Sequence, residues 1–186
     1  EATLKLGNPT EAAKLFRKAL TAQPSHAVAT NNLGAVLLRS GQSEEATRLF
    51  RKAIKLRPDY GGALNNLGNV MLASGQVSEA IELYRKGIAA TPDSPELRNN
   101  LGAALFRQGH AMEAREEFSA AVRLRPHFAK ARVNLGMVEL QLGELPEAVE
   151  DLTKAISLDP KLALAYVYRG QAHESAGHTA DAVSDY

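Results

Sequence analysis

Four asparagines that recur at a fixed spacing are the side chains in this sequence of 186 residues with the clearest chemical use. They are Asn32, Asn66, Asn100 and Asn134, each 34 residues from the next. A primary amide carries both donors and an acceptor, so it can pair with the N–H and C=O of an extended peptide of any sequence. Asparagine is a poor helix former, so helix propensity does not explain the recurrence. The row therefore predicts a binding site for a peptide backbone.

A second row of polar residues accompanies the first. An asparagine stands directly before three of the four, and the run breaks at Val133. Nearby cations give this surface a modest positive character. The accompanying candidate residues for peptide binding are Asn31, Asn65, Asn99, Asn69, Lys130, Arg39 and Arg107. The alternative interpretation is that the asparagines are solvated residues that repeat duplication has copied. We expect no buried partner for Asn66 and Asn100, so replacing both by alanine should leave thermal unfolding nearly unchanged.

The sequence offers little support for catalysis or metal binding. It has no cysteine, which excludes disulfides, thiolate nucleophiles and cysteine-ligated metals. The stretch from His173 to His178 is similar to the zinc-protease signature, but it has one residue too many and contains Gly177, which ends a helix. We therefore expect no catalytic residue, no metal site and no cofactor.

Composition limits the classes of partner. There are 22 basic and 21 acidic residues, for a formal charge of +1, which gives no bulk attraction to nucleic acid or to an anionic membrane. No apolar run approaches the roughly 20 residues that cross a bilayer. We expect protein or peptide partners, no nucleic acid and no membrane insertion. The compartment stays open, with a weak preference for the cytoplasm.

The spacing of the asparagines is that of the whole chain. Prolines recur every 34 residues from Pro24 to Pro160, and glycines do so from Gly7 to Gly177. When repeat position 1 is set at Ala27, the predicted organisation is one array of four full and two partial repeats. The full repeats are 27–60, 61–94, 95–128 and 129–162, and the partial repeats are 1–26 and 163–186. Both ends fall inside helices, so we expect a fragment of a longer protein and self-association through exposed end repeats.

Each repeat has the pattern of two helices. Apolar residues recur at three- and four-residue intervals on both sides of a glycine at position 15, which indicates two amphipathic helices joined by a turn. Position 8 is glycine, position 20 is alanine and position 24 carries a large side chain, as in Gly34, Ala46 and Phe50. The small pair is expected to make room for the large one. The predicted fold is all-α, an α-solenoid of helix-turn-helix repeats.

These residues resemble a known family. The set of Leu33, Gly34, Ala46, Phe50, Ala53 and Pro58, with its period, resembles the tetratricopeptide repeat (TPR). The resemblance implies a right-handed superhelix whose first helices line a concave groove for a partner's peptide or helix. The asparagine row is similar to that in the TPR superhelix of O-linked N-acetylglucosamine transferase, which holds substrate polypeptide by its backbone.

Some TPR modules hold a partner's terminal carboxylate with a clamp of lysines, asparagines and an arginine. Asn69, Asn100 and Lys130 match that clamp, whereas Asn65 and Asn134 stand where it has lysine and arginine. Amides replace charge-assisted donors poorly, so we do not expect a full clamp.

The predicted function is a non-catalytic scaffold that binds an extended peptide or a helix in its groove. One alternative is the substrate-recruiting arm of a larger enzyme, such as a glycosyltransferase. Another is a structural array that assembles through repeat faces. Two positions depart from the repeat pattern: Glu139 and His173 both stand at position 11, where Leu37, Met71 and Leu105 are apolar, and we expect looser packing at Glu139.

Overall fold

The computed structural model describes residues 9–186, so Gly7 and the rest of the predicted partial repeat before Pro9 lie outside the described residues. The described residues form helices and no strand, which confirms the predicted all-α class. The helices are α1 (Pro9–Ala22), α2 (Ala27–Arg39), α3 (Ser43–Leu56), α4 (Gly61–Ala73), α5 (Val77–Ala90), α6 (Pro95–Arg107), α7 (Ala111–Leu124), α8 (Ala129–Leu142), α9 (Leu145–Leu158), α10 (Ala163–Ser175) and α11 (Thr179–Asp185).

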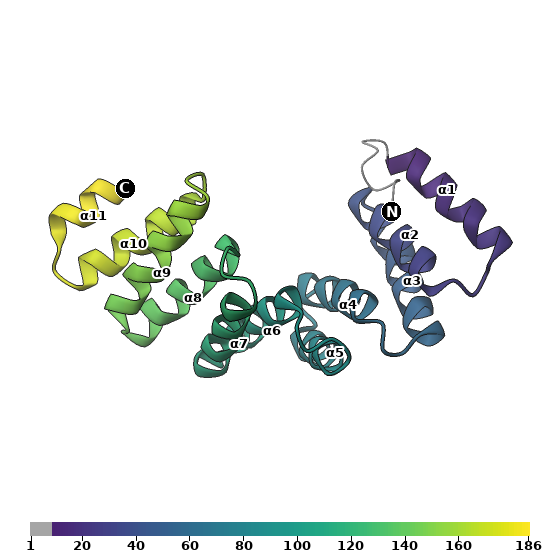
Figure 1. The fold of residues 1–186 in the computed structure, drawn as a ribbon, viewed down its shortest axis with the longest axis horizontal. Coiled ribbons are helices and arrows are strands. Elements are labelled where there is room, and N and C mark those ends of the chain that lie inside the picture. The colour runs from purple at the N-terminus through teal and green to yellow at the C-terminus, as the bar shows by residue number, and fades with distance from the viewer. Residues whose placement is uncertain (1–8) are drawn as a thin grey trace. The chain divides into compact units, whose positions relative to one another are not determined.

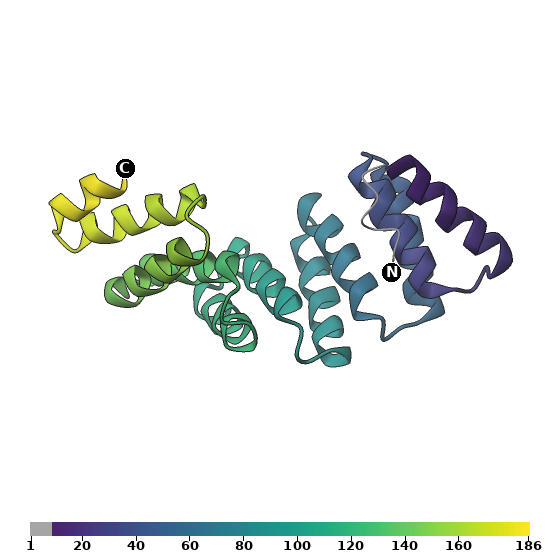
Figure 2. The same ribbon diagram turned by 45° about the horizontal axis from the view of Figure 1, so that its top comes forward.

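The chain forms two compact units, Glu1–Pro92 and Asp93–Tyr186. The described part of unit 1 holds α1 to α5, and unit 2 holds α6 to α11. Within each unit a helix packs mainly against its neighbours in the chain, as the pairs α4 with α5 and α8 with α9 show in both views (Figures 1 and 2). First helices of successive repeats also meet, α2 with α4 and α8 with α10.

The turn within each helical pair depends on glycine. The glycines at position 15 that the structure describes all have φ between 79° and 91°, as in Gly41 and Gly109. A side chain with a Cβ rarely adopts this left-handed conformation, which reverses the chain after a helix. The predicted role of these glycines is confirmed.

A close approach of the two helices explains the glycine at position 8. A Cβ on Gly68 would lie 2.5 Å from Cε1 of Tyr84, and a Cβ on Gly102 would lie 2.8 Å from the Phe118 ring. Tyr84 and Phe118 are completely buried. The structure confirms that these glycines make room for the large side chain at position 24, which offsets the cost of glycine inside a helix, about 1 kcal/mol.

One carboxyl group lies inside unit 2. Only 6% of Glu139 is exposed, and Oε2 is buried without a hydrogen-bond partner. Burial, and then repulsion from Asp151 and Glu144, raises the pKa of Glu139 to about 7. The looser packing expected at this position is not seen, since the carboxyl group is enclosed like the apolar side chains of Leu37 and Leu105. Among the described residues, no helix combines the length and the apolar character needed to span a bilayer.

Candidate peptide-binding site

The asparagines join consecutive repeats through their side chains. In unit 1, Nδ2 of Asn66 donates a 2.9 Å hydrogen bond to Oδ1 of Asn31. In unit 2, Nδ2 of Asn134 donates a bond of the same length to Oδ1 of Asn99. Each bond runs from position 6 of one repeat to position 5 of the repeat before it. The two rows that the sequence shows are therefore one hydrogen-bonded system within each unit.

Asn31 and Asn99, at position 5, each use both ends of the side-chain amide. Nδ2 of Asn31 donates to Oδ1 of Asn32 at 3.3 Å, and Nδ2 of Asn99 donates to Oδ1 of Asn100 at 3.3 Å. Asn31 is also buried, with 5% exposed. The expectation that Asn66 has no buried partner is therefore wrong, because its amide bonds to a buried asparagine.

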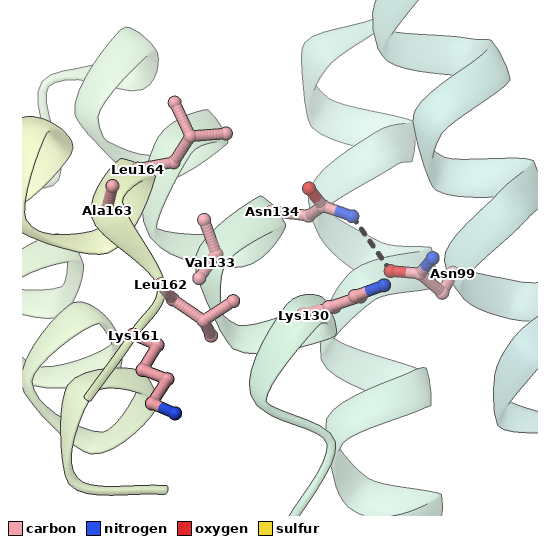
Figure 3. Close-up of a pocket in the computed structure, with 8 residues that line it drawn as sticks. All are labelled: Asn99, Lys130, Val133, Asn134, Lys161, Leu162, Ala163 and Leu164. Atoms are coloured by element: carbon pink, nitrogen blue, oxygen red, sulfur yellow. Dashed lines mark hydrogen bonds between the residues drawn. The ribbon is translucent and has the colours of Figure 1, made fainter. Parts of the chain in front are cut away.

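Val133 changes this pattern in unit 2. Valine has no amide to donate to Asn134, and Oδ1 of Asn134 has no hydrogen-bond partner among the described residues. Figure 3 shows the nitrogen of Asn134 turned toward Asn99 and its oxygen turned away. The Asn134 side chain is half-buried, so this oxygen is an acceptor on the surface of α8.

Asn134 lines a hollow of about 420 Å³ in unit 2. Its wall combines amides, lysines and apolar side chains (Figure 3). The lining residues are Asn99, Lys130, Val133, Asn134, Lys161, Leu162, Ala163 and Leu164. Three of the residues predicted to bind peptide, Asn99, Lys130 and Asn134, thus share one hollow.

Lys161 and Leu164 also line this hollow, and the repeat pattern did not indicate either of them as a candidate. Lys161 and Leu162 lie in the turn before α10, and Leu164, which is 59% exposed, lies at the start of that helix. The polar rows of the first helices do not include these residues, and the only sequence signal for them is the lysine directly after Pro160. Turns between repeats reach the same surface as the first helices.

The hollow is electropositive. The ammonium groups of Lys130 and Lys161 are exposed, and neither has a carboxylate within ion-pair distance among the described residues. Unpaired cations beside an apolar wall attract an anionic group that also brings apolar surface. Water is displaced most readily from the side formed by Val133, Leu162 and Leu164.

The remaining predicted residues lie elsewhere. Asn69 is exposed on α4, where its Oδ1 accepts a 2.7 Å hydrogen bond from the buried Tyr84 hydroxyl, whose pKa burial raises. Asn69 lines a second hollow, of about 320 Å³, in unit 1 with Leu38 and Val70. Asn65 is half-buried on α4, and Arg39 and Arg107 are exposed at the ends of α2 and α6. These three residues line neither hollow.

Comparison with known families follows the repeat pattern. Models described as tetratricopeptide repeat match residues 1–59, 49–82 and 99–163, and one described as TPR repeat matches 68–109. Together they span most of the chain. A search of curated protein sequences finds no match.

Solved structures of similar fold include one described as a TPR protein. YrrB, described as a TPR protein with an unusual peptide-binding site, is 24% identical with a TM-score of 0.77 over 93% of this chain and 89% of its own. A MamA structure is 29% identical with a TM-score of 0.74 over 82% of this chain and 90% of its own. PilF of Pseudomonas aeruginosa is 21% identical with a TM-score of 0.88 over 98% of this chain and 83% of its own.

Three features of the structure agree with these matches. They are helical pairs with a 34-residue period, a glycine in the left-handed conformation in each turn, and a glycine against a large side chain in each pair. The chain belongs to the tetratricopeptide repeat family, whose repeats are protein-interaction modules.

Proposed function

We propose that the chain is a scaffold that binds an extended peptide segment of a partner protein in the hollow of unit 2. The segment carries an acidic side chain next to an apolar one. Asn134 accepts a hydrogen bond from the peptide backbone, Lys130 and Lys161 attract the acidic side chain, and Val133, Leu162 and Leu164 cover the apolar side chain. No residue of the chain needs to perform chemistry for this function.

The observation that carries the proposal is the coincidence of unsatisfied groups in one hollow. Oδ1 of Asn134 has no donor, and two ammonium groups have no carboxylate, among the described residues. Exposed apolar surface lies beside them at Leu164. A bound peptide would supply the N–H, the carboxylate and the apolar surface that these groups lack. The fold of YrrB, a TPR protein with a peptide-binding site, agrees with such a use of helical repeats.

A peptide array tests this function. The chain is applied to an array of 12-residue peptides that vary in acidic and apolar content, and the strongest ligands are measured by fluorescence anisotropy. We expect the strongest ligands to pair Asp or Glu with Leu, Ile or Phe, and K130A/K161A to weaken them by about tenfold, which is about 1.4 kcal/mol.

The matched control is K52A/K55A, which removes the same charge from exposed positions on α3 in unit 1. It should leave the affinity within about twofold. Equal losses in both double variants would mean that net charge alone attracts the peptide, and the proposed hollow would be wrong. A scaffold and the recruiting arm of a larger enzyme would use the same hollow, so the test applies to both.

Self-association through the end repeats stays a prediction. Light scattering over a range of chain concentrations measures it independently of any peptide.

A further inference from the structure

Three metal-ligating side chains lie together in the last helical pair of unit 2. His173 belongs to α10, His178 lies directly before α11, and Asp181 lies in the first turn of α11. Each offers one ligand atom, and these atoms all lie within 4.8 Å of one another. The two imidazole rings have their centroids 6.0 Å apart. Small side-chain rotations would bring such atoms to a common centre.

The repeat explains why these residues meet. They occupy positions 11, 16 and 19, and in repeat 95–128 the last two of these positions also hold a His and a carboxylate. There Nδ1 of His110 lies 2.7 Å from Oε1 of Glu113. Position 11 of that repeat is the buried Leu105, so only two polar groups meet. In repeat 163–186, position 11 is His173, which adds a third polar group to the pair.

The two imidazoles of this cluster do not stabilise the described helices through hydrogen bonds. Nδ1 of His173 is buried and has no hydrogen-bond partner. His178 precedes α11 as its N-cap residue, but its side chain makes no capping hydrogen bond. The Asp181 carboxylate is exposed and supplies negative charge. A buried polar atom without a partner is costly, so hydrogen bonding within the fold does not explain a histidine at this position.

We propose that His173, His178 and Asp181 bind a divalent transition-metal ion of the zinc class. Two neutral imidazoles and one carboxylate are ligands that zinc takes in proteins, with water in the fourth position of a tetrahedron. The same set binds nickel and copper, whereas the hard ions magnesium and calcium prefer oxygen ligands throughout. The proposal replaces the sequence-based expectation of no metal, which rested on the extra residue between His173 and His178 and on Gly177 between them.

The ion would join α10 to α11 across the turn at Gly177. α11 is a short helix in which Ala182 alone is buried, and Arg169 of α10 also binds the Asp185 carboxylate of α11. Metal binding that requires both helices stabilises the folded pair by mass action. The site is independent of the peptide hollow, so failure of either proposal leaves the other standing.

Isothermal titration of the tag-free chain with zinc chloride at pH 7.5 tests the site. We expect the titration to show one zinc ion bound per chain. Thermal unfolding, measured separately, should occur several degrees higher when zinc is in excess. Magnesium chloride should give no heat of binding and no shift.

Variants locate the site. H178A and D181N change exposed side chains, and each should weaken zinc binding at least tenfold. H173L restores the leucine found at position 11 in Leu37 and Leu105, so it should abolish binding while the zinc-free chain unfolds at the same or a higher temperature. H110A, the matched control at position 16 of repeat 95–128, should bind zinc like the wild type. Absence of zinc binding in the wild type, or equal losses in H110A and H178A, would overturn the proposal.

Discussion

The side-chain nitrogen of Asn66 donates a 2.9 Å hydrogen bond to the side-chain oxygen of Asn31, which lies in the preceding repeat and is buried. This bond connects α4 to α2, two helices that are not consecutive in the chain. The amide nitrogen of Asn66 is therefore part of the contact between repeats. Only the other hydrogen-bonding groups of the Asn66 amide can bind a peptide. Its role in peptide binding is therefore smaller than that of an asparagine without a partner.

The Asn31–Asn66 contact predicts a stability effect in unit 1. N31A removes the acceptor and leaves Nδ2 of Asn66 half-buried without its partner, so it should lower the free energy of unfolding by about 1–2 kcal/mol. N66A should cost about 1 kcal/mol, and the double variant should cost less than the sum. Urea unfolding followed by circular dichroism measures all three. Q42A, which changes an exposed residue whose side chain makes no capping bond, is the control and should unfold like the wild type.

The contact between Gly68 and Tyr84 predicts overpacking. G68L places its Cβ within 2.5 Å of the Tyr84 ring, so it should destabilise unit 1 by several kcal/mol, more than the usual 1–3 kcal/mol for added core volume. In G62A, on the exposed side of the same helix, the nearest atom to the added methyl group belongs to the Tyr60 ring, at 3.1 Å. That variant should cost little. Thermal unfolding of G68L at the wild-type temperature would show that the two helices separate readily.

The opposite change in unit 2 creates a cavity. Phe118 is completely buried against Gly102, so F118A should cost about 3–5 kcal/mol, the usual range for deletion of a buried ring. F106L is a suitable control because Phe106 is half-buried and keeps most of its apolar contact as leucine. Denaturant unfolding compares the two variants. A loss below about 1 kcal/mol in F118A would mean that neighbouring side chains fill the space.

The buried Glu139 predicts a pH dependence. Its pKa is raised from 4.5 to about 7 in the folded chain, so between these values the folded state holds a proton that the unfolded state has released. The free energy of unfolding contributed by this group therefore falls as pH rises from about 4.5 to about 7, by on the order of 3 kcal/mol, and stays constant outside that window.

E139Q removes this titration and keeps the shape of the side chain. Denaturant unfolding at pH 5 and pH 8 should show a larger loss on raising the pH in the wild type than in E139Q, which should be the more stable of the two at pH 8. Since other groups titrate equally in both chains, the comparison isolates Glu139. An equal loss in both would mean that the carboxyl group has an ordinary pKa.

The hollow of unit 2 predicts whether the terminal carboxylate of a peptide contributes to binding. If Asn134 accepts a hydrogen bond from the peptide backbone, N134A should weaken binding by about 1 kcal/mol, the usual net value of a neutral bond, or about fivefold. Binding should be equal for the free-acid and the amidated form of one labelled peptide, because the proposed ligand group is an internal acidic side chain and not the end of the peptide. Fluorescence anisotropy compares both forms. A larger loss on amidation than in N134A would favour a terminal-carboxylate clamp that uses Lys130.

The fold follows from the sequence because each feature recurs with the period. Glycines such as Gly41 fix the turn through their backbone conformation, and pairs such as Gly68 with Tyr84 fix the distance between two helices. Both are local properties of one repeat. The structure inferred for one repeat therefore predicts the structure of the next. Glu139 shows the limit: position 11 is buried by its place in the helical pair even when its residue is charged.

The site is less predictable because it depends on contacts between repeats. The sequence places Asn66 and Asn31 at neighbouring positions of consecutive repeats, but it does not show that the two amides bond to each other rather than to a ligand. It also does not show that Lys161, in a turn, faces the same hollow as Lys130 on α8. Such relations depend on how helices of different repeats cross, which no single repeat encodes.

The restriction of packing to neighbouring helices has a mechanical consequence. Since the contacts within each unit join helices that are close in the chain, every pairing closes only a short loop, and folding pays little entropy before contacts form. Among the described helices of one unit, no contact between helices far apart in the chain has to break first under tension. A pulled chain should therefore lengthen in small steps, helix by helix or pair by pair from a unit's end, at low force and with refolding on release. A protein built this way extends like a spring, whereas one with a single shared core ruptures at once.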